Sequence, residues 1–321
     1  MSWDQAIPRP RPGPEANFPS ADASDREVRW HNVTMETRAG LRTVDSEIIA
    51  LAEDEFEAAA EGAGIIVREI HTAAEAAEAS LLLDEVWNVD KTGTNVFEPG
   101  LIVAFAHAGN YVSAAFSADD PEEMIGVTVG FFGQPLGTVM HSHIAGVRHG
   151  HVGHGAGSAM KLHQRLWCLE LGITEMTWTF DPLIARNAYF NFQRLGVSMV
   201  EYLEDFYGQM RDGLNEGQAS DRMMVSWPLD RPARVPAVPA DSAFACLRAD
   251  ASGEPLISEV PREAAVVSLD FPSDIENLRR HDAELAARWR VALRDSLTAL
   301  IADGWVVDTC LKGGTYLLHH P

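Results

Sequence analysis

Apolar and polar residues recur with two different periodicities between residues 64 and 229. Short runs that alternate or are continuously apolar predict strands, whereas apolar residues three or four apart predict helices. The predicted order is strand, helix, helix, three strands, helix, strand, helix, strand, strand. The expected ranges are, in that order, 64–70, 73–87, 99–109, 111–117, 124–132, 137–147, 157–171, 173–180, 185–195, 197–203 and 222–229.

Capping residues sharpen several of these boundaries. Thr72 is expected to cap the first helix with Glu75 as the partner of a capping box, and Pro99 suits the first turn of the second helix. Gly172 and Gly196 follow the last two helices as stop signals. The helix over 157–171 is predicted to bury one apolar face, made of Ala159, Leu162, Leu166 and Leu169.

The chain outside 64–230 divides into four further parts. Residues 1–30 are rich in Pro, Ser, Ala and Asp and are expected to form a flexible arm, and 31–63 a helical or irregular extension. A Pro-rich linker at 231–240 predicts a domain boundary, because serial prolines suit neither helix nor ladder. The remainder, 241–321, is expected to be a small α+β domain. Its predicted elements are strands at 243–248 and 264–271, a long helix at 274–302 and a terminal hairpin turning at 312–314.

The charge balance excludes some partners. The chain of 321 residues carries 25 Lys and Arg against 47 Asp and Glu, a formal net charge of -22. Its field should repel nucleic acid and anionic membrane surfaces, so we expect neither as a partner. An anionic ligand would need local groups such as backbone N–H donors to overcome this field.

The cysteines and the apolar runs bear on location. The chain has three cysteines, Cys168, Cys246 and Cys310, which are far apart and show no paired spacing. No run approaches the roughly 20 apolar residues that cross a bilayer, and the N-terminus has no signal-peptide core. A soluble protein of the reducing cytoplasm is expected.

A glycine-rich turn joins the predicted strand 137–147 to the helix that follows it. It reads Val152-Gly153-His154-Gly155-Ala156-Gly157-Ser158. Glycines let the backbone approach a ligand closely, and the first N–H groups of a helix point to the same place as its positive dipole end. The turn therefore predicts a backbone site for a pyrophosphate. A Rossmann turn is disfavoured by the antiparallel strands before it, and a Walker turn by the absence of Gly-Lys-Ser/Thr.

The order of elements over 64–229, with this turn after the fourth strand, resembles the GNAT superfamily of acyl-CoA N-acyltransferases. Gly155 and Gly157 match the family turn Gln/Arg-x-x-Gly-x-Gly/Ala, while Val152 stands where Gln or Arg is expected. The resemblance implies a mixed α/β fold with a central, mostly antiparallel sheet flanked by helices. It also implies a cofactor, acetyl-CoA or succinyl-CoA, that acts as acyl donor, and no metal.

The resemblance further implies where CoA binds. Pantetheine would lie beside the end of the fourth strand, at Ile144, Ala145, Gly146 and Val147. The pyrophosphate would meet the amides of Gly153 to Ser158, and Asn187 would bond the pantetheine arm or, equally, cap its helix. The segments His141–Ile144, Trp178–Pro182 and Arg186–Asn191 are similar to a longer GNAT subgroup. Some of its members are thought to succinylate amino acids alongside an N-succinylamino-acid racemase.

Catalysis would need a general base and an acid for the leaving thiolate. His141 and His143 are the candidate bases, because the period of two places both on one strand face, although either alone is more often a core histidine. The family's acid tyrosine falls at Phe192 here, so Tyr189 is the substitute candidate. Asp181 could orient a histidine or bind the acceptor ammonium, but Asp-Pro is also an ordinary turn opener.

Two other functions stay open. The histidines from His141 to His163 would suit a zinc hydrolase, although no Cys or His-Glu-x-x-His accompanies them. A non-catalytic acyl-CoA-binding module would fit the departures at Phe192 and Val152. The favoured acceptor is a small-molecule amine, and Arg186 and Arg194 are candidates for a succinyl carboxylate. The sequence leaves a homodimer open.

Overall fold

The computed structural model describes residues 43–89, 95–208, 219–234, 236, 238 and 242–321. The predicted arm over 1–30 lies outside these residues. The larger sheet and its helices comprise α1 (Ser46–Ala63), β1 (Ile65–Glu69), α2 (Ala73–Val86), α3 (Pro99–His107), β2 (Val112–Ser117), β3 (Met124–Phe132), β4 (Val139–Val147), α4 (Ala156–Glu170), β5 (Glu175–Phe180), α5 (Ala185–Tyr189), β6 (Ser198–Leu203) and β7 (Arg222–Pro228). A π-helical stretch, Phe190–Leu195, extends α5.

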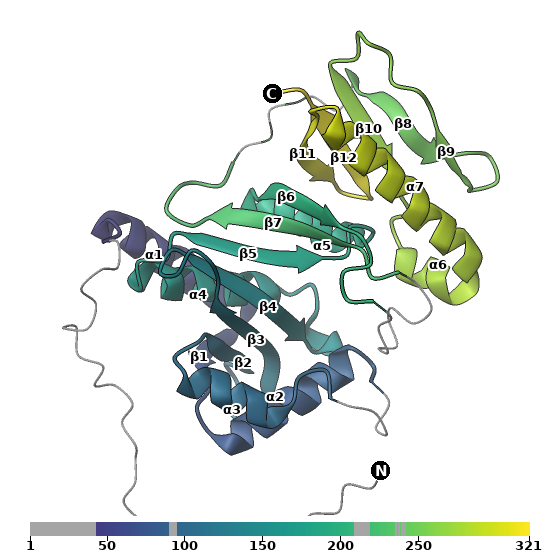
Figure 1. Cartoon of the computed structure of the whole chain (residues 1–321). Helices are drawn as coiled ribbons and strands as arrows, with labels where there is room; N and C mark the ends of the chain where they lie inside the picture. The colour runs from purple at the N-terminus through teal and green to yellow at the C-terminus, as the bar shows by residue number, and fades with distance from the viewer. Residues whose placement is uncertain (1–42, 90–94, 209–218, 235, 237, 239–241) are drawn as a thin grey trace, which may run out of the picture. The chain divides into compact units, whose positions relative to one another are not determined.

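Seven strands form one sheet in the order β1-β2-β3-β4-β5-β7-β6 (Figure 1). Every neighbouring pair is antiparallel except β4 and β5, which run parallel. The meander predicted for the second to fourth strands is confirmed, as is the mixed α/β fold with a mostly antiparallel sheet. The single parallel pair is the place where the chain leaves the meander through α4, because parallel neighbours need a crossover.

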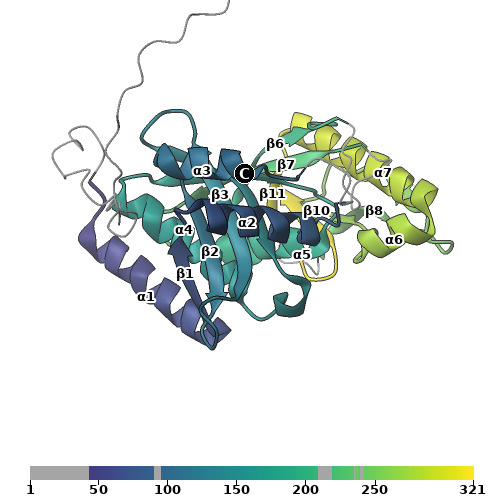
Figure 2. The same cartoon turned by 90° about the horizontal axis from the view of Figure 1, so that it is seen from below.

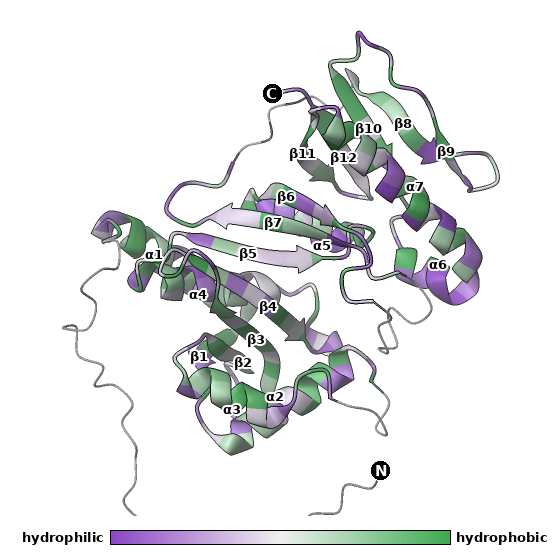
Figure 3. Ribbon diagram, viewed as in Figure 1, coloured by the Kyte–Doolittle hydropathy of each residue, from purple (hydrophilic) through white to green (hydrophobic). Residues whose placement is uncertain are grey.

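Helices cover both faces of this sheet (Figures 1 and 2). On one face, α2 and α3 bury Leu82, Leu83 and Ile102 against β2 and β3. On the other face, α4 packs on the sheet and α1 packs along α4. Hydrophobic residues fill most of α3, while α6 (Ile275–His281) of the C-terminal region is largely hydrophilic (Figure 3). None of the helices in the described residues is long and apolar enough to span a bilayer.

The C-terminal region forms a second, five-stranded sheet in the order β11-β12-β10-β8-β9. Its elements are β8 (Phe244–Ala249), β9 (Pro255–Ile257), β10 (Val266–Asp270), α6 (Ile275–His281), α7 (Ala283–Ala302), β11 (Val306–Leu311) and β12 (Thr315–His319). The predicted hairpin at 312–314 is confirmed. The single helix predicted over 274–302 is wrong, because Asp282 ends α6 and accepts from the Leu285 N–H as the N-cap of α7.

Both regions contribute to one hydrophobic cluster. Phe192 and Leu195 of the larger sheet's helices pack in the same cluster as Leu293 of α7 and Tyr316 of β12. The domain boundary expected at the Pro-rich linker stays a prediction, since shared packing does not tell whether either region folds alone.

Local signals placed several ends correctly. Thr72 and Glu75 form the expected capping box, and Gly196 ends the π-helical stretch with a φ of 69°. The buried face predicted for α4 is wrong in part: Ala159 and Leu169 are buried, but Leu162 and Leu166 are only half-buried. Lys161, Gln164, Arg165 and Cys168 are buried beside them, because α4 is covered by the sheet on one side and by α1 on the other.

Candidate functional site

The strands β4 and β5 separate partway along their length. Their parallel pairing covers Val139 to His141 on β4 and ends at the pair His141 and Thr177. Beyond that pair, β4 continues to Val147 on its other neighbour β3, and β5 continues to Phe180 on β7. The edge of β4 that faces β5 therefore has unpaired backbone groups, which a ligand can use as an added strand would.

A bulge in β4 determines which backbone groups face this gap. The register with β3 shifts at His143, which is the extra residue between Ser142 and Ile144. The Arg148 N–H donates to the Ile125 carbonyl at 2.9 Å, so by alternation Gly146 and Ile144 direct their backbone groups to β3. Ala145 and Val147 direct theirs into the gap. Of the four residues predicted to meet pantetheine, these two offer hydrogen bonds.

The glycine turn lies at the end of β4 and opens α4. Gly153 has a φ of 88° and Gly155 one of 95°, values that favour glycine. Gly155 is the N-cap and no side chain caps the helix; the first N–H groups of α4, on Ala156 and Gly157, have no backbone partner among the described residues. The turn thus presents donors to solvent at the positive end of the helix dipole.

The space beside the glycines of this turn is open. A Cβ placed on Gly157 or Gly153 would meet no atom within 4 Å. Val152 and His154 are exposed and Ser158 is half-buried. The predicted pyrophosphate site therefore has donors and room, but no cationic side chain of its own turn.

The two histidines lie on one face of the sheet, as predicted. Their ring centroids are 6.4 Å apart, and both rings contact Phe131 of β3. Phe97 contacts His143 at 5.6 Å, and Phe105 stacks on both Phe97 and Phe131. The histidines are thus held in an aromatic cluster on the α2 and α3 side of the sheet.

This setting keeps both imidazoles neutral near pH 7. Burial, together with the neighbouring His143 and Lys161, lowers the pKa of His141 to about 4. Burial also lowers the pKa of His143, although its side chain is more exposed. Nδ1 of His141 lies 3.2 Å from the Thr177 hydroxyl, which fixes the ring. A neutral imidazole can accept a proton.

A pocket of about 440 Å³ opens beside His141 on the same face. Its walls come from the strands β3 to β7 and from the β3–β4 connection. They consist of Phe131, Gly133, Gln134, Pro135, Val139, His141, Glu175, Thr177, Val200 and Met224. Glu175 is its one carboxylate and accepts a hydrogen bond from the Ser226 hydroxyl at 2.7 Å. Sequence reasoning missed this pocket, because its walls come from segments as far apart as Phe131 and Met224.

The predicted acid lies on α5. Tyr189 is half-buried and its hydroxyl makes no hydrogen bond with the described residues. Asn187 is exposed, and the N-cap of α5 is Ile184, so the capping role considered for Asn187 is wrong. Phe192 is 1% exposed and meets the Tyr316 ring edge-on at 6.0 Å. The position at which the GNAT resemblance implies an acid tyrosine is therefore closed by the C-terminal region.

Asp181 does not orient a histidine among the described residues. It is buried, and its Oδ2 accepts from Arg279 at 2.6 Å and from Arg290 at 2.8 Å. Burial alone would raise the pKa of Asp181, but the guanidinium groups of Arg290 and Arg279 hold it well below its usual range. The carboxylate is occupied by a structural ion pair, so the structure corrects its assignment as a catalytic group.

Lys161 is the titratable group that sequence reasoning missed. It lies on α4, is 9% exposed, and donates to the Ser142 hydroxyl at 2.8 Å and to the Gln164 Oε1 at 3.0 Å. The spacing of Lys161, Gln164, Arg165 and Cys168 on one helix face was the available signal. Polar side chains at such positions ordinarily mark a solvated face, which conceals the signal.

The histidines near the turn have different neighbours. His151 lies 3.8 Å from Glu123, and His163 points into the protein, where its Nδ1 is 2.7 Å from the Tyr111 hydroxyl. Within the described ranges, no group of three or more His, Cys, Asp and Glu is arranged to hold a metal ion.

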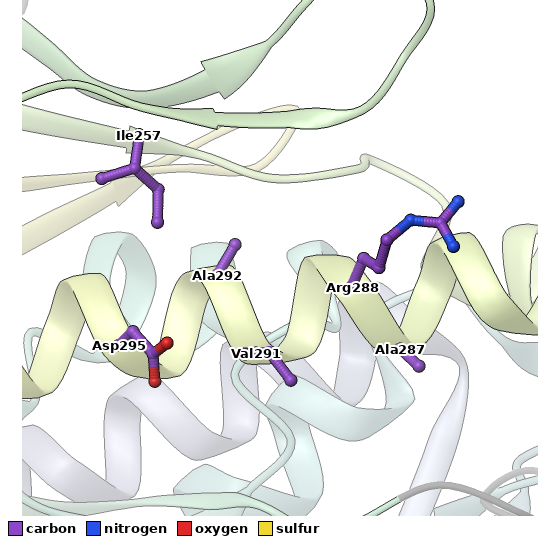
Figure 4. Close-up of a pocket in the computed structure, with 6 residues that line it drawn as sticks. All are labelled: Ile257, Ala287, Arg288, Val291, Ala292 and Asp295. Atoms are coloured by element: carbon purple, nitrogen blue, oxygen red, sulfur yellow. The ribbon is translucent and has the colours of Figure 1, made fainter.

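A second pocket, of about 360 Å³, lies between α7 and β9 (Figure 4). Figure 4 shows Ile257 above α7. Arg288 and Ala292 lie on the side of α7 that faces Ile257, whereas Val291 and Ala287 point away from it. Arg288 is paired with Glu254. Few polar groups converge in this pocket, so it is a weaker candidate than the gap between β4 and β5.

No family model and no curated protein matches the chain. Several solved structures do. They include the phosphinothricin acetyltransferase of Sinorhizobium meliloti in complex with acetyl-CoA, described as a GNAT protein, at 13% identity and a TM-score of 0.42, covering 51% of this chain and 88% of that one. A putative acetyltransferase of Salmonella typhimurium with acetyl-CoA shares 16% identity at a TM-score of 0.40, covering 53% and 97%. The IAA acetyltransferase of Bacillus cereus shares 15% at 0.39, covering 51% and 99%.

Proposed function

We propose that this chain is an acyl-CoA-dependent N-acyltransferase of the GNAT type. It would move an acetyl or succinyl group from CoA to the amine of a small molecule, such as an amino acid. The observation that carries the proposal is the separation of β4 from β5 between an uncapped glycine turn and a pair of neutral histidines. A thioester ligand needs these three features together: an edge to bind its amides, donors for its phosphates and a base.

The donor would bind along the free edge of β4. The pantetheine amides would pair with Ala145 and Val147, whose backbone groups face the gap. The pyrophosphate would accept hydrogen bonds from the free amides of the turn, such as those of Ala156 and Gly157; the Ser158 amide, also expected as a donor, is already bonded to the Gly155 carbonyl at 3.0 Å. Backbone donors of this kind hold an anion locally, which answers the repulsion from a net charge of -22.

The acceptor would approach from the face that carries the histidines. An ammonium must lose a proton before its nitrogen can attack, and His141 or His143 would take that proton. The lowered pKa values keep both imidazoles in the neutral form that can accept it. The nitrogen then attacks the thioester carbon, the C–N bond forms, and the C–S bond breaks with its electron pair on sulfur. The pocket beside His141 would hold the rest of the acceptor.

The identity of the acyl group depends on one further contact. A succinyl carboxylate would need a cationic partner, and Arg186 is already paired with Glu276 of α6. Arg194 is exposed and remains a candidate. The acetyl donor needs no such partner and is the first to test.

A thiol-release screen tests the proposal. Purified protein is mixed with acetyl-CoA or succinyl-CoA and with amino acids of both chiralities and simple amines, and free CoA is measured with a thiol reagent. Amine-dependent release supports N-acyl transfer, and mass spectrometry of the acceptor identifies the amide. Binding of CoA without release from any amine would contradict catalysis.

The second candidate is a non-catalytic acyl-CoA-binding protein. The observation that favours it is the burial of Phe192 under Tyr316, where an acid tyrosine is expected. Such a protein would gain thermal stability from acyl-CoA and release no thiol, so the same screen with a melting assay separates the two functions.

A further inference from the structure

Lys161 bridges the two strands at the point where they separate. Ser142 and Trp178 are the first residues of β4 and β5 beyond the last paired residues, His141 and Thr177. Nζ of Lys161 donates to the Ser142 hydroxyl at 2.8 Å and lies 4.4 Å from the centre of the Trp178 ring. The amine therefore lies at the apex of the gap, on the face covered by α4.

No carboxylate neutralises this amine. Among the described residues no ion pair includes Lys161, and its other contacts are the Gln164 Oε1 at 3.0 Å and the Met176 sulfur at 3.8 Å. The titratable groups that face it are Cys168 on its own helix and His141 on β4; β5 contributes none. Burial lowers the pKa of Lys161 to about 7, an effect that Cys168 partly offsets. Both protonation states are thus populated near neutral pH.

The residue type suits this position. The chain has only three lysines among its 25 basic residues, so arginine is the common cation of this sequence. Arginine stays protonated at any ordinary pH, whereas a buried lysine can release and regain a proton. A lysine at the apex can therefore transfer protons where an arginine could not.

The bound thioester would reach this apex. From Val147, beside the turn, to Ser142 is five residues of extended strand, or about 17 Å at ~3.3 Å per residue. A pantetheine arm laid along Ala145 from the turn is extended in the same direction and carries its sulfur at the far end. The sulfur and the Ser142 hydroxyl then meet where β4 and β5 separate.

We propose that Lys161, acting through the Ser142 hydroxyl, supplies the proton that the leaving CoA thiolate takes up; this inference rests on the proposed function. When the C–S bond breaks, its electron pair stays on sulfur. The Ser142 proton moves to the sulfur while a proton of the Lys161 ammonium moves to the Ser142 oxygen. The lysine, now neutral, is reprotonated from solvent, which receives the proton lost by the acceptor amine. Ser142 contacts the sulfur, and Lys161 positions and replenishes its proton.

The ionisation of the bound CoA thiol tests this directly, without any turnover. Thiolate absorbance is followed against pH for free CoA and for CoA bound to wild type, Lys161→Met, Ser142→Ala and the control Lys312→Met, whose lysine lies exposed in the hairpin turn. Transfer of the thiol proton through Ser142 to the neutral Lys161 amine gives a thiolate beside an ammonium, and each of these charges favours the other. We expect the bound thiol to ionise at lower pH in wild type and Lys312→Met, and this shift to disappear in Lys161→Met and shrink in Ser142→Ala.

The outcomes separate the two proposals. Equal thiol ionisation in wild type and both site variants, with CoA still bound, overturns the role of Lys161 and leaves the proposed function standing. Failure of wild type to bind CoA overturns both. With an active acceptor, Lys161→Met should lower kcat about 10²-fold and remove the fall in rate above neutral pH. An unchanged alkaline limb would also overturn the inference, whereas a merely structural lysine would change kcat without changing that limb.

Discussion

Titratable side chains lie together in two places of the protein, and the two groups differ in their ion pairing. At Asp181, one carboxylate is enclosed by two guanidinium groups, so the buried anion is held by two opposite charges. At the gap between β4 and β5, Lys161 is buried and His141 half-buried, His143 is more exposed, and none of the three forms an ion pair with a carboxylate among the described residues. Pairing holds a group in its charged form, whereas burial without pairing pushes it toward its neutral form. We expect the first arrangement to stabilise the fold and the second to suit proton transfer.

The largest effect is expected from breaking the paired site. Asp181→Ala removes the buried carboxylate that Arg279 and Arg290 share, which should lower the free energy of unfolding by about 3–5 kcal/mol. Urea denaturation monitored by Trp fluorescence measures the loss. The control is Glu254→Ala, which breaks the exposed pair with Arg288 and should change stability little. Similar losses in both variants would show that Asp181 is not the structural ion pair inferred here.

Removing the unpaired charge of Lys161 should have the opposite effect: it should raise the free energy of unfolding. The folded pKa of Lys161 is about 7 against an ordinary value of 10.5, so below pH 7 the folded state carries a buried ammonium. That penalty is fully present below about pH 7 and disappears as pH rises toward 10.5, because the unfolded state then binds the extra proton. Lys161→Met should therefore be more stable than wild type at pH 6, by an amount on the order of a few kcal/mol.

The measurement for Lys161→Met is its unfolding free energy relative to wild type at several pH values from 6 to about 10. The difference should stay constant up to about pH 7 and then shrink steadily toward pH 10. A difference independent of pH would mean that the lysine ionises normally in the folded protein.

Catalysis should depend on the histidines more than stability does. His141→Ala removes the candidate base from the aromatic cluster and should lower kcat about 10²-fold, with CoA binding retained, because the imidazole faces the acceptor side. His281→Ala, at an exposed position of α6, is the matched control. In wild type the acid limb of the rate profile should lie near pH 4, below the usual 6.5, since burial disfavours the imidazolium. Full activity of His141→Ala would remove it from the mechanism.

Local signals explain which parts of the fold could be predicted from sequence. The capping box at Thr72 and the glycine at Gly196 act within one helical turn, so their effect is visible in a few residues. Asp282 was missed because an N-cap inside a continuous helical pattern resembles an ordinary polar position. The buried face of α4 was misread because α1 packs on the side opposite the sheet, and periodicity alone assumes one buried side.

The site was predictable only where its parts are close in sequence. The turn and the two histidines lie on one strand and its following loop, so their common location followed from strand periodicity. The partners of Asp181 come from α6 and α7, about a hundred residues later, and no local pattern connects them. Likewise, Lys161 contacts Ser142 and Trp178, and these two residues are neighbours only because the sheet pairs their strands.

The smallest effect concerns Val152, where the turn lacks the polar side chain of the GNAT pattern. Val152 is 52% exposed at the turn, where the GNAT pattern has Gln or Arg. Val152→Gln adds a side-chain donor near the expected pyrophosphate and should strengthen CoA binding by about 0.5–1.5 kcal/mol, or roughly 2- to 10-fold in Kd. Calorimetric titration with CoA measures the change. Val291→Gln, at a similarly exposed valine of α7, should leave Kd unchanged. If both variants bind CoA as wild type does, the phosphates do not lie at Val152 and the backbone turn is not their site.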